Sequence, residues 1–218
     1  ICSGLVGSEM CIRDRLGMTP MLLPCRPKTG MLPEVDIAEM LITPQTRGIV
    51  LVTPNNPSGT VYPTGLIGDF YRLAQAKGLY LILDETYRDF LNPEQVLPHH
   101  LLNLSWQENL VQLYSFSKSF ALSGYRIGAI TASSEFLKEL VKVMDCAAIC
   151  APKLGQRSAL YALMHLHDWR EEKKQLMNLR AESFRQHFQE NNLSGFRLST
   201  LGPCFAYIRH SEVGETAY

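Results

Sequence analysis

The chain has 218 residues, of which 46% are hydrophobic, and its 21 lysine and arginine residues balance 21 aspartate and glutamate residues. This length allows one large domain, or one and a fraction, with a sizeable buried core. A net charge of zero gives no reason to expect attraction to nucleic acid or to an anionic membrane surface. No apolar run approaches the length of a transmembrane helix, so we expect neither a nucleic-acid partner nor a membrane partner.

The first fifteen residues differ from the rest of the chain. They show no hydrophobic period, and the run from Gly7 to Arg15 is similar to translated non-coding or adapter sequence. The segment is also too short, and too polar at its centre, for a signal peptide. We therefore expect residues 1–15 to be a non-native leader and exclude them from the fold prediction.

Strands and helices are predicted to alternate through the first half of the chain. Apolar residues at helical spacing predict helices at 35–41 and 66–74, and Gly78 is placed to end the second of them. Continuous apolar runs are typical of strands that are buried in a parallel sheet. Strands are expected at residues 48–52, 79–83, 110–114 and 127–131. This alternation predicts an α/β fold with a three-layer, mostly parallel sheet.

The second half of the chain is predicted to be mainly helical. Apolar spacing predicts helices at 136–147 and 154–166. A longer helix follows, and Asp168 is expected to cap it with Glu171 at the reciprocal position. Residues 202–208 have the pattern of a strand that enters a second domain.

This order of elements predicts two domains. Residues 16–170 would form most of a large domain. Residues 171–218 would form a long connecting helix and the start of a smaller α+β domain that the chain does not finish. There is no internal repeat or low-complexity tract that would favour another arrangement.

Polar side chains follow three consecutive predicted strands, where ligands collect in an open α/β sheet. They are Asn55 and Asn56 after the first strand, Asp84 and Tyr87 after the second, and Ser115, Ser117 and Lys118 after the third. Because the carboxyl ends of parallel strands meet at one edge, we expect these side chains to share one crevice.

Four motifs occur in a fixed order along the chain: Thr53–Gly59 (TPNNPSG), Asp84–Tyr87 (DETY), Ser115–Lys118 (SFSK) and Arg126. In this order and spacing the sequence resembles the class I/II aminotransferases, which are fold-type I enzymes dependent on pyridoxal 5′-phosphate (PLP). The resemblance covers the chain from about Leu16 to its end. It implies that the large domain binds PLP, that an amino acid and a 2-oxo acid are the substrates, and that the protein is a cytoplasmic homodimer.

The resemblance assigns the catalytic roles to three residues. Lys118 would form the Schiff base with PLP and then shuttle a proton between the substrate α-carbon and the cofactor; the alternative is a solvated loop lysine. Asp84 would keep the pyridine nitrogen protonated so that the ring accepts electrons, whereas the alternative is a helix N-cap. Tyr87 would donate to the phenolate oxygen of PLP, and the alternative is packing on the sheet edge.

The remaining cofactor contacts are implied in the same way. Asn56 would be the second donor to the phenolate oxygen; the alternative is a turn residue in an Asn-Pro loop, which is common on its own. Ser115 and Arg126 would hold the phosphate, with Ser117 as a further candidate; a surface salt bridge is the alternative for Arg126. Gly124 is expected to allow a tight backbone path near the cofactor.

Cysteines and histidines give weaker indications. The six cysteines form no C-x-x-C pair, and we expect free thiols in a reducing compartment and no metal site, although Cys146 and Cys150 are four residues apart. His99 and His100 lie in a proline-flanked loop with no carboxylate or cysteine nearby in the sequence. No functional role is therefore predicted for them.

Parts of the family pattern are not found in the chain. The glycine-rich phosphate segment and the aromatic residue that stacks on PLP are expected upstream of it, and the arginine for the substrate carboxylate downstream. Arg197 and Arg209 do not have the matching context. We therefore expect the chain to have poor solubility or weak PLP retention.

Other functions remain open at this stage. A PLP-dependent C–S lyase that performs β-elimination would use the same cofactor residues. A PLP-sensing transcription regulator would need a basic winged-helix domain before the present start. A dinucleotide-binding oxidoreductase is disfavoured because no strand leads into a G-x-G-x-x-G motif.

Overall fold

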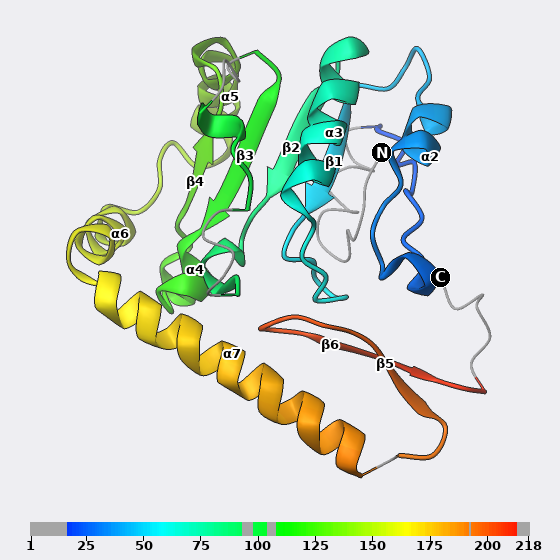
Figure 1. Cartoon of the computed structure of the whole chain (residues 1–218). Coiled ribbons are helices and arrows are strands. Elements are labelled where there is room, and N and C mark those ends of the chain that lie inside the picture. The colour runs from blue at the N-terminus through cyan, green and yellow to red at the C-terminus, as the bar shows by residue number, and fades with distance from the viewer. Residues whose placement is uncertain (1–16, 93–97, 104–107, 192, 213–218) are drawn as a thin grey trace.

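A computed structural model describes residues 17–92, 98–103, 108–191 and 193–212 (Figure 1). Its main feature is a sheet in the order β1-β2-β3-β4, formed by Gly48–Val52, Tyr80–Asp84, Leu110–Ser115 and Gly128–Thr131. The first three strands are parallel, and β4 is antiparallel to β3. This confirms the predicted α/β fold with a mostly parallel sheet. The direction of β4 had no signal in the sequence.

The helices lie close to their predicted positions, except that the four-residue helix at Phe116–Ser119 was not predicted. They are α2 (Val35–Leu41), α3 (Thr64–Ala76), α4 (Phe116–Ser119), α5 (Ser134–Ala147), α6 (Lys153–His165) and α7 (His167–Glu190). Short 3-10 helices occupy Pro27–Thr29 (η1), Arg88–Phe90 (η2), Leu101–Asn103 (η3) and Ser123–Tyr125 (η4). Among the described residues, no helix is both long and apolar enough to cross a membrane.

The expected cap of the long helix is wrong. Leu166 occupies the N-cap position of α7 and makes no side-chain cap, whereas Asp168 lies inside the first turn. The helix starts one residue before Asp168 because α6 ends at His165 and leaves only Leu166 between the two helices. Asp168 still suits this place, because a carboxylate in the first turn interacts favourably with the helix dipole.

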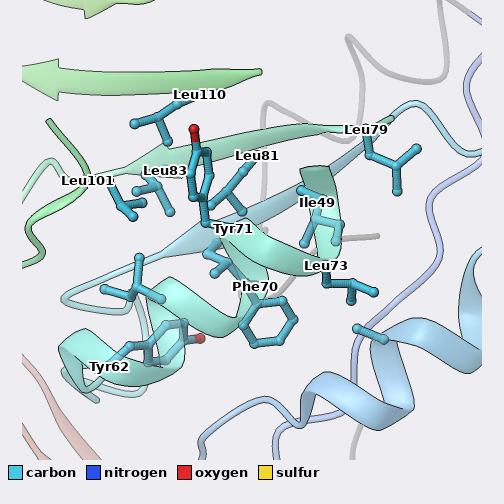
Figure 2. Packing of buried hydrophobic residues seen from close by; sticks show 14 of the residues in the cluster. Ile49, Tyr62, Phe70, Tyr71, Leu73, Leu79, Leu81, Leu83, Leu101 and Leu110 are labelled. Carbon is cyan, nitrogen blue, oxygen red and sulfur yellow. The ribbon is translucent and has the colours of Figure 1, made fainter. Parts of the chain in front are cut away.

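The main hydrophobic core lies between α3 and the strands β1 to β3 (Figure 2). Phe70 and Ile67 of α3 are fully buried against Ile49 of β1 and Leu81 of β2. Burying one such side chain stabilises a fold by about 1.5–3 kcal/mol. The core therefore fixes the strands whose carboxyl ends carry the predicted site.

The other side of the molecule is much more open. Every residue of β4 is exposed, and α5 buries none of its residues. Large apolar side chains are exposed on α5 and α6: Val141, Val143, Met144, Leu154, Leu160, Tyr161, Leu163 and Met164. Exposed apolar surface favours self-association, so poor solubility stays a prediction for this chain.

A second sheet follows α7. It is an antiparallel pair formed by β5 (Phe196–Leu201) and β6 (Ala206–His210), so the first part of the expected strand at 202–208 is the connecting loop. Figure 1 shows this hairpin and α7 on the side of the main sheet at which the parallel strands end. The division into domains at residue 170 remains a prediction.

The hairpin meets the main sheet through two glycines. A Cβ atom on Gly59, which has φ +74°, would lie 2.5 Å from the Phe205 carbonyl oxygen and 2.7 Å from the Gly202 nitrogen. Thr200 donates its hydroxyl to the Ser58 carbonyl oxygen beside this contact. The loop that follows β1 and the loop that follows β5 are therefore packed backbone against backbone.

We predict that Gly59→Ala undocks the hairpin. A side chain there is strained by the positive φ, at a cost of about 1–3 kcal/mol, and also displaces Gly202 and Phe205. Hydrogen exchange should become faster in β5 and β6, and the denaturation midpoint should fall. Gly68→Ala in α3 is the matched control, because only Arg72 lies within 4 Å and helix propensity should raise stability by up to about 1 kcal/mol. Unchanged exchange in the hairpin of Gly59→Ala would contradict the docking described here.

Candidate functional site

The carboxyl ends of the three parallel strands form one edge at which the predicted residues meet. Val52 is in register with Asp84, and Asp84 with Leu113. The Thr53 amide donates to the Asp84 carbonyl oxygen at 3.0 Å, and the Glu85 amide donates to the Leu113 carbonyl oxygen at 3.0 Å. The backbone at Asp84 is thus held from both neighbouring strands.

The Asp84 side chain shapes a turn. It is half-buried, and its Oδ1 accepts the Thr86 amide at 3.0 Å and the Thr86 hydroxyl at 2.7 Å. The alternative role as a helix N-cap is not seen, since Tyr87 occupies that position of η2. Within the described residues Oδ2 accepts no hydrogen bond, so this oxygen is available to a ligand.

The two asparagines after β1 have different environments. Asn55 is buried. Its side-chain Nδ2 donates to the Val52 carbonyl oxygen at 3.3 Å, and its Oδ1 accepts the backbone amide and the hydroxyl of Ser58 at 3.2 and 2.8 Å. Asn55 therefore holds the loop together. Asn56, the predicted cofactor residue, is exposed and can offer its side chain to a ligand.

Lys118 lies on the short helix that follows β3. The side chain of Ser115, the last residue of β3, caps this helix by accepting the Ser117 amide at 3.2 Å. Lys118 itself is exposed, and its Nζ lies 5.9 Å from the centre of the Tyr87 ring. Ser115 keeps its hydroxyl proton for donation, so its predicted contact with a phosphate is compatible with the cap.

Tyr87 connects these groups to the hairpin. Its ring meets the Phe205 ring edge-on, with the centroids 5.0 Å apart. Burial raises the pKa of Tyr87, and Cys204 and Asp84 raise it further. The phenol therefore stays protonated at neutral pH and can act as a hydrogen-bond donor. The alternative of simple sheet-edge packing is not what the structure shows, because Tyr87 packs on the hairpin loop.

Cys204 was not predicted as part of this site. Burial raises the pKa of its thiol to about 11, and the positive charge of Lys118 opposes this shift. Cys204 is therefore within electrostatic range of both Lys118 and Tyr87. Its position depends on how the hairpin docks on the main sheet, and the sequence around Gly202 indicates only a turn and a strand.

Arg126 is separate from this group within the described residues. It is exposed, with φ +51°, and its Nη1 donates to the Ser123 carbonyl oxygen at 3.0 Å. The described residues provide it with no salt bridge, so the alternative surface ion pair is not seen either. No described protein atom lies within 4 Å of a Cβ built on Gly124, so the tight path expected there near the cofactor stays a prediction.

His99 has a partner that the sequence did not reveal. Its Nε2 lies 2.9 Å from Oε1 of Glu85, and both side chains are buried. No sequence pattern indicated this pair, because the two residues are separated in the chain and meet only when the loop that contains His99 folds against the end of β2. The described residues contain no group of three or more histidine, cysteine, aspartate or glutamate side chains placed to bind a metal.

Known proteins are similar to this chain in sequence. The profile of the family "Aminotransferase class I and II" matches residues 11–214, which includes the last five residues of the expected leader. An aromatic aminotransferase of Arabidopsis thaliana is 31% identical over 159 residues, which cover 70% of this chain and 39% of the relative. An aspartate/prephenate aminotransferase of Thermus thermophilus is 31% identical over 143 residues, which cover 63% of this chain and 35% of the relative.

Two solved structures show similarity of fold. A mutant aspartate aminotransferase of Thermus thermophilus superposes with a TM-score of 0.80 at 24% identity and covers 91% of this chain and 51% of its own. A PLP-dependent aminotransferase of Streptococcus suis gives 0.81 at 22% identity, with 96% and 55% covered. The chain thus spans less than half of the two curated relatives and about half of these structures.

We predict that Cys204 reacts slowly with iodoacetamide at pH 8. A raised pKa leaves little thiolate, so alkylation should be roughly tenfold to a hundredfold slower than at the exposed Cys146. Lys118→Met should slow Cys204 further, because it removes the charge that favours the thiolate. Peptide mapping by mass spectrometry measures each cysteine separately. Equal rates at Cys204 and Cys146 would show that the thiol is not buried beside Lys118.

Proposed function

Because the chain belongs to the class I and II aminotransferase family, we propose that it transfers an amino group between an amino acid and a 2-oxo acid with pyridoxal 5′-phosphate as cofactor. The observation that carries this proposal is the grouping of Lys118, Asp84 and Tyr87 at the carboxyl ends of the parallel strands. A lysine and a carboxylate that flank a phenol at one strand edge are groups that PLP chemistry can use.

The side chains present fit this cofactor. Asp84 has one carboxylate oxygen without a hydrogen bond from the described residues, and Tyr87 keeps its proton. Lys118 is exposed, and no carboxylate among the described residues forms an ion pair with it. Within the described residues, the Lys118 ammonium forms no ion pair and one Asp84 oxygen accepts no hydrogen bond, so both can interact with a ligand.

Each residue can be given a task. The Asp84 carboxylate would hold a proton on the pyridine nitrogen, and the Tyr87 hydroxyl and the Asn56 amide would donate to the phenolate oxygen. Bound PLP supplies an aldehyde for amines and a ring that accepts electrons. Lys118 would anchor the cofactor, and its Nζ would then accept and return a proton at the substrate α-carbon.

The phosphate would be held by hydroxyl groups and by a guanidinium. Ser115 and Ser117 lie at the start of α4, next to Lys118, and each can donate a hydroxyl proton. Arg126 is exposed and would add a charge-assisted contact by a change of its side-chain rotamer.

We further propose that the protein is a homodimer in the cytoplasm, with residues 16–170 as the PLP-binding domain, residues 171–218 as the start of the smaller domain, and residues 1–15 as a leader. These proposals rest on the resemblance to the family and on the sequence pattern. The exposed apolar side chains of α5 and α6 are compatible with a covered surface in a larger assembly.

Because the chain is expected to retain PLP weakly, we predict that PLP in large excess is needed to produce the absorbance band of a lysine-bound cofactor, and that Lys118→Ala abolishes this band. Borohydride reduction followed by peptide mapping should place the reduced cofactor on the peptide that contains Lys118. Lys138→Ala is the control, since Lys138 is an exposed lysine on α5. A band of equal strength in Lys118→Ala would refute the assignment of this lysine.

We predict transfer rather than elimination once PLP is bound. An amino acid added to the PLP-loaded chain should convert the cofactor to its aminated form, and 2-oxoglutarate should restore the original band. New glutamate and a new keto acid, measured by chromatography, support the proposed activity. Pyruvate and ammonia from a sulfur-containing amino acid would instead identify a C–S lyase.

A further inference from the structure

A buried charged cluster lies directly beside Asp84 and has no part in the function proposed above. Its centre is Glu85, whose side chain is fully buried. Its Oε2 accepts a hydrogen bond from the side-chain Nε2 of Gln112 in β3 and lies 2.9 Å from Nη1 of Arg88 in η2. Oε1 lies 2.9 Å from Nε2 of His99 in the loop before β3. Glu85 thus joins three separate elements.

His99 is oriented toward this carboxylate by its own backbone contact. Its Nδ1 accepts the Leu101 amide at 3.2 Å, which places the ring proton on Nε2, facing Glu85. The approach is close, but neither Oε1 nor Nε2 makes a well-aligned hydrogen bond within the described residues. The contact is therefore mainly electrostatic, and it depends on both groups keeping their positions.

A gain in folding stability does not explain why these charged side chains are buried together. Taking a carboxylate out of water is costly, and a buried ion pair often contributes no more than an apolar pair of the same size. Buried polar groups of this kind can instead fix one arrangement of the chain, provided that their partners are in place. The arrangement fixed here is the turn that carries Asp84 and Tyr87.

The connection between Glu85 and this turn is short. The Glu85 amide is bonded to β3, and the Glu85 carbonyl oxygen accepts the Arg88 amide at 3.0 Å. The Arg88 side chain returns to the Glu85 carboxylate, so that main chain and side chain close a ring around Thr86 and Tyr87. The Glu85 carboxylate is therefore tied to both ends of the segment that contains Thr86 and Tyr87.

We propose that Glu85 is a positioning residue: its carboxylate, held by Gln112, Arg88 and His99, fixes the turn so that Asp84 and Tyr87 face the same ligand as Lys118. This inference rests on the proposed function for the identity of the ligand, which is PLP. The rigidity of the turn, however, is a property of the chain without cofactor and can be measured separately.

The test compares Glu85→Gln with the unmodified chain. Glutamine keeps the shape of the side chain but removes the charge that Arg88 and His99 face. Without PLP, we expect faster hydrogen exchange at the amides of Thr86 to Arg88 and faster alkylation of Cys204, whose neighbour Tyr87 is released. With PLP, we expect the affinity to fall roughly tenfold or more, the range seen when groups that orient a ligand's direct contacts are lost.

Two further variants keep the test decisive. Ile67→Val in α3 removes one methylene from the core and should lower the melting temperature without changing exchange at residues 86–88, Cys204 alkylation or PLP affinity. If Glu85→Gln does not fold, His99→Asn removes one of the three partners and should shift the same readouts less. Glu85→Gln behaving like Ile67→Val, with a lower melting temperature and nothing else, would overturn the proposal.

The two proposals can fail independently. If neither the unmodified chain nor any variant binds PLP through Lys118, the proposed function fails, while exchange and alkylation in the cofactor-free chain still decide the role of Glu85. If PLP binds through Lys118 with equal affinity in Glu85→Gln, and the turn exchanges at the unmodified rate, the function stands and the positioning role is refuted.

Discussion

The site depends on the pairing of Asp84 between two parallel strands. Its carbonyl oxygen accepts the Thr53 amide after β1, and the next amide along the chain donates to Leu113 of β3. These bonds fix the backbone at the point where β2 ends, and the core between α3 and the sheet fixes the strands themselves. Because the backbone cannot shift there, the direction of each following side chain is set by strand geometry and local turns.

The turn after β2 is also tied to the elements that follow it in the sequence. The Asp89 carboxylate accepts a hydrogen bond from the Tyr114 hydroxyl of β3 and lies 3.6 Å from the Arg170 guanidinium of α7. The side-chain Nδ2 of Asn178, also in α7, donates to the Phe90 carbonyl oxygen at 3.4 Å. On the other side, Phe205 packs against Tyr87. The long helix α7 and the hairpin therefore both contact the segment that contains Tyr87. A movement of either element would change the position of Tyr87.

The sequence predicted those features that depend on local pattern. Continuous apolar runs located β1 to β3, and the motifs after them identified Lys118, Asp84 and Tyr87, which the structure brings together. Contacts between segments that are distant in the sequence could not be predicted from a local pattern. His99 lies beside Glu85 because the loop before β3 folds back onto the end of β2. Cys204 lies near the site because the hairpin packs against Gly59. The antiparallel direction of β4 likewise becomes visible only in its pairing with β3.

The adjacent carboxylates at the end of β2, Asp84 and Glu85, lie in different environments. Asp84 and Glu85 follow one another in extended backbone, so their side chains point to opposite sides. Asp84 is half-buried and keeps one oxygen without a partner among the described residues, whereas Glu85 is fully buried and surrounded by an amide, a guanidinium and an imidazole. The difference lies in the surroundings of the two positions and not in the kind of charge. Only the carboxylate that has protein partners can be withdrawn from water without leaving an unpaired buried charge, and that carboxylate is Glu85.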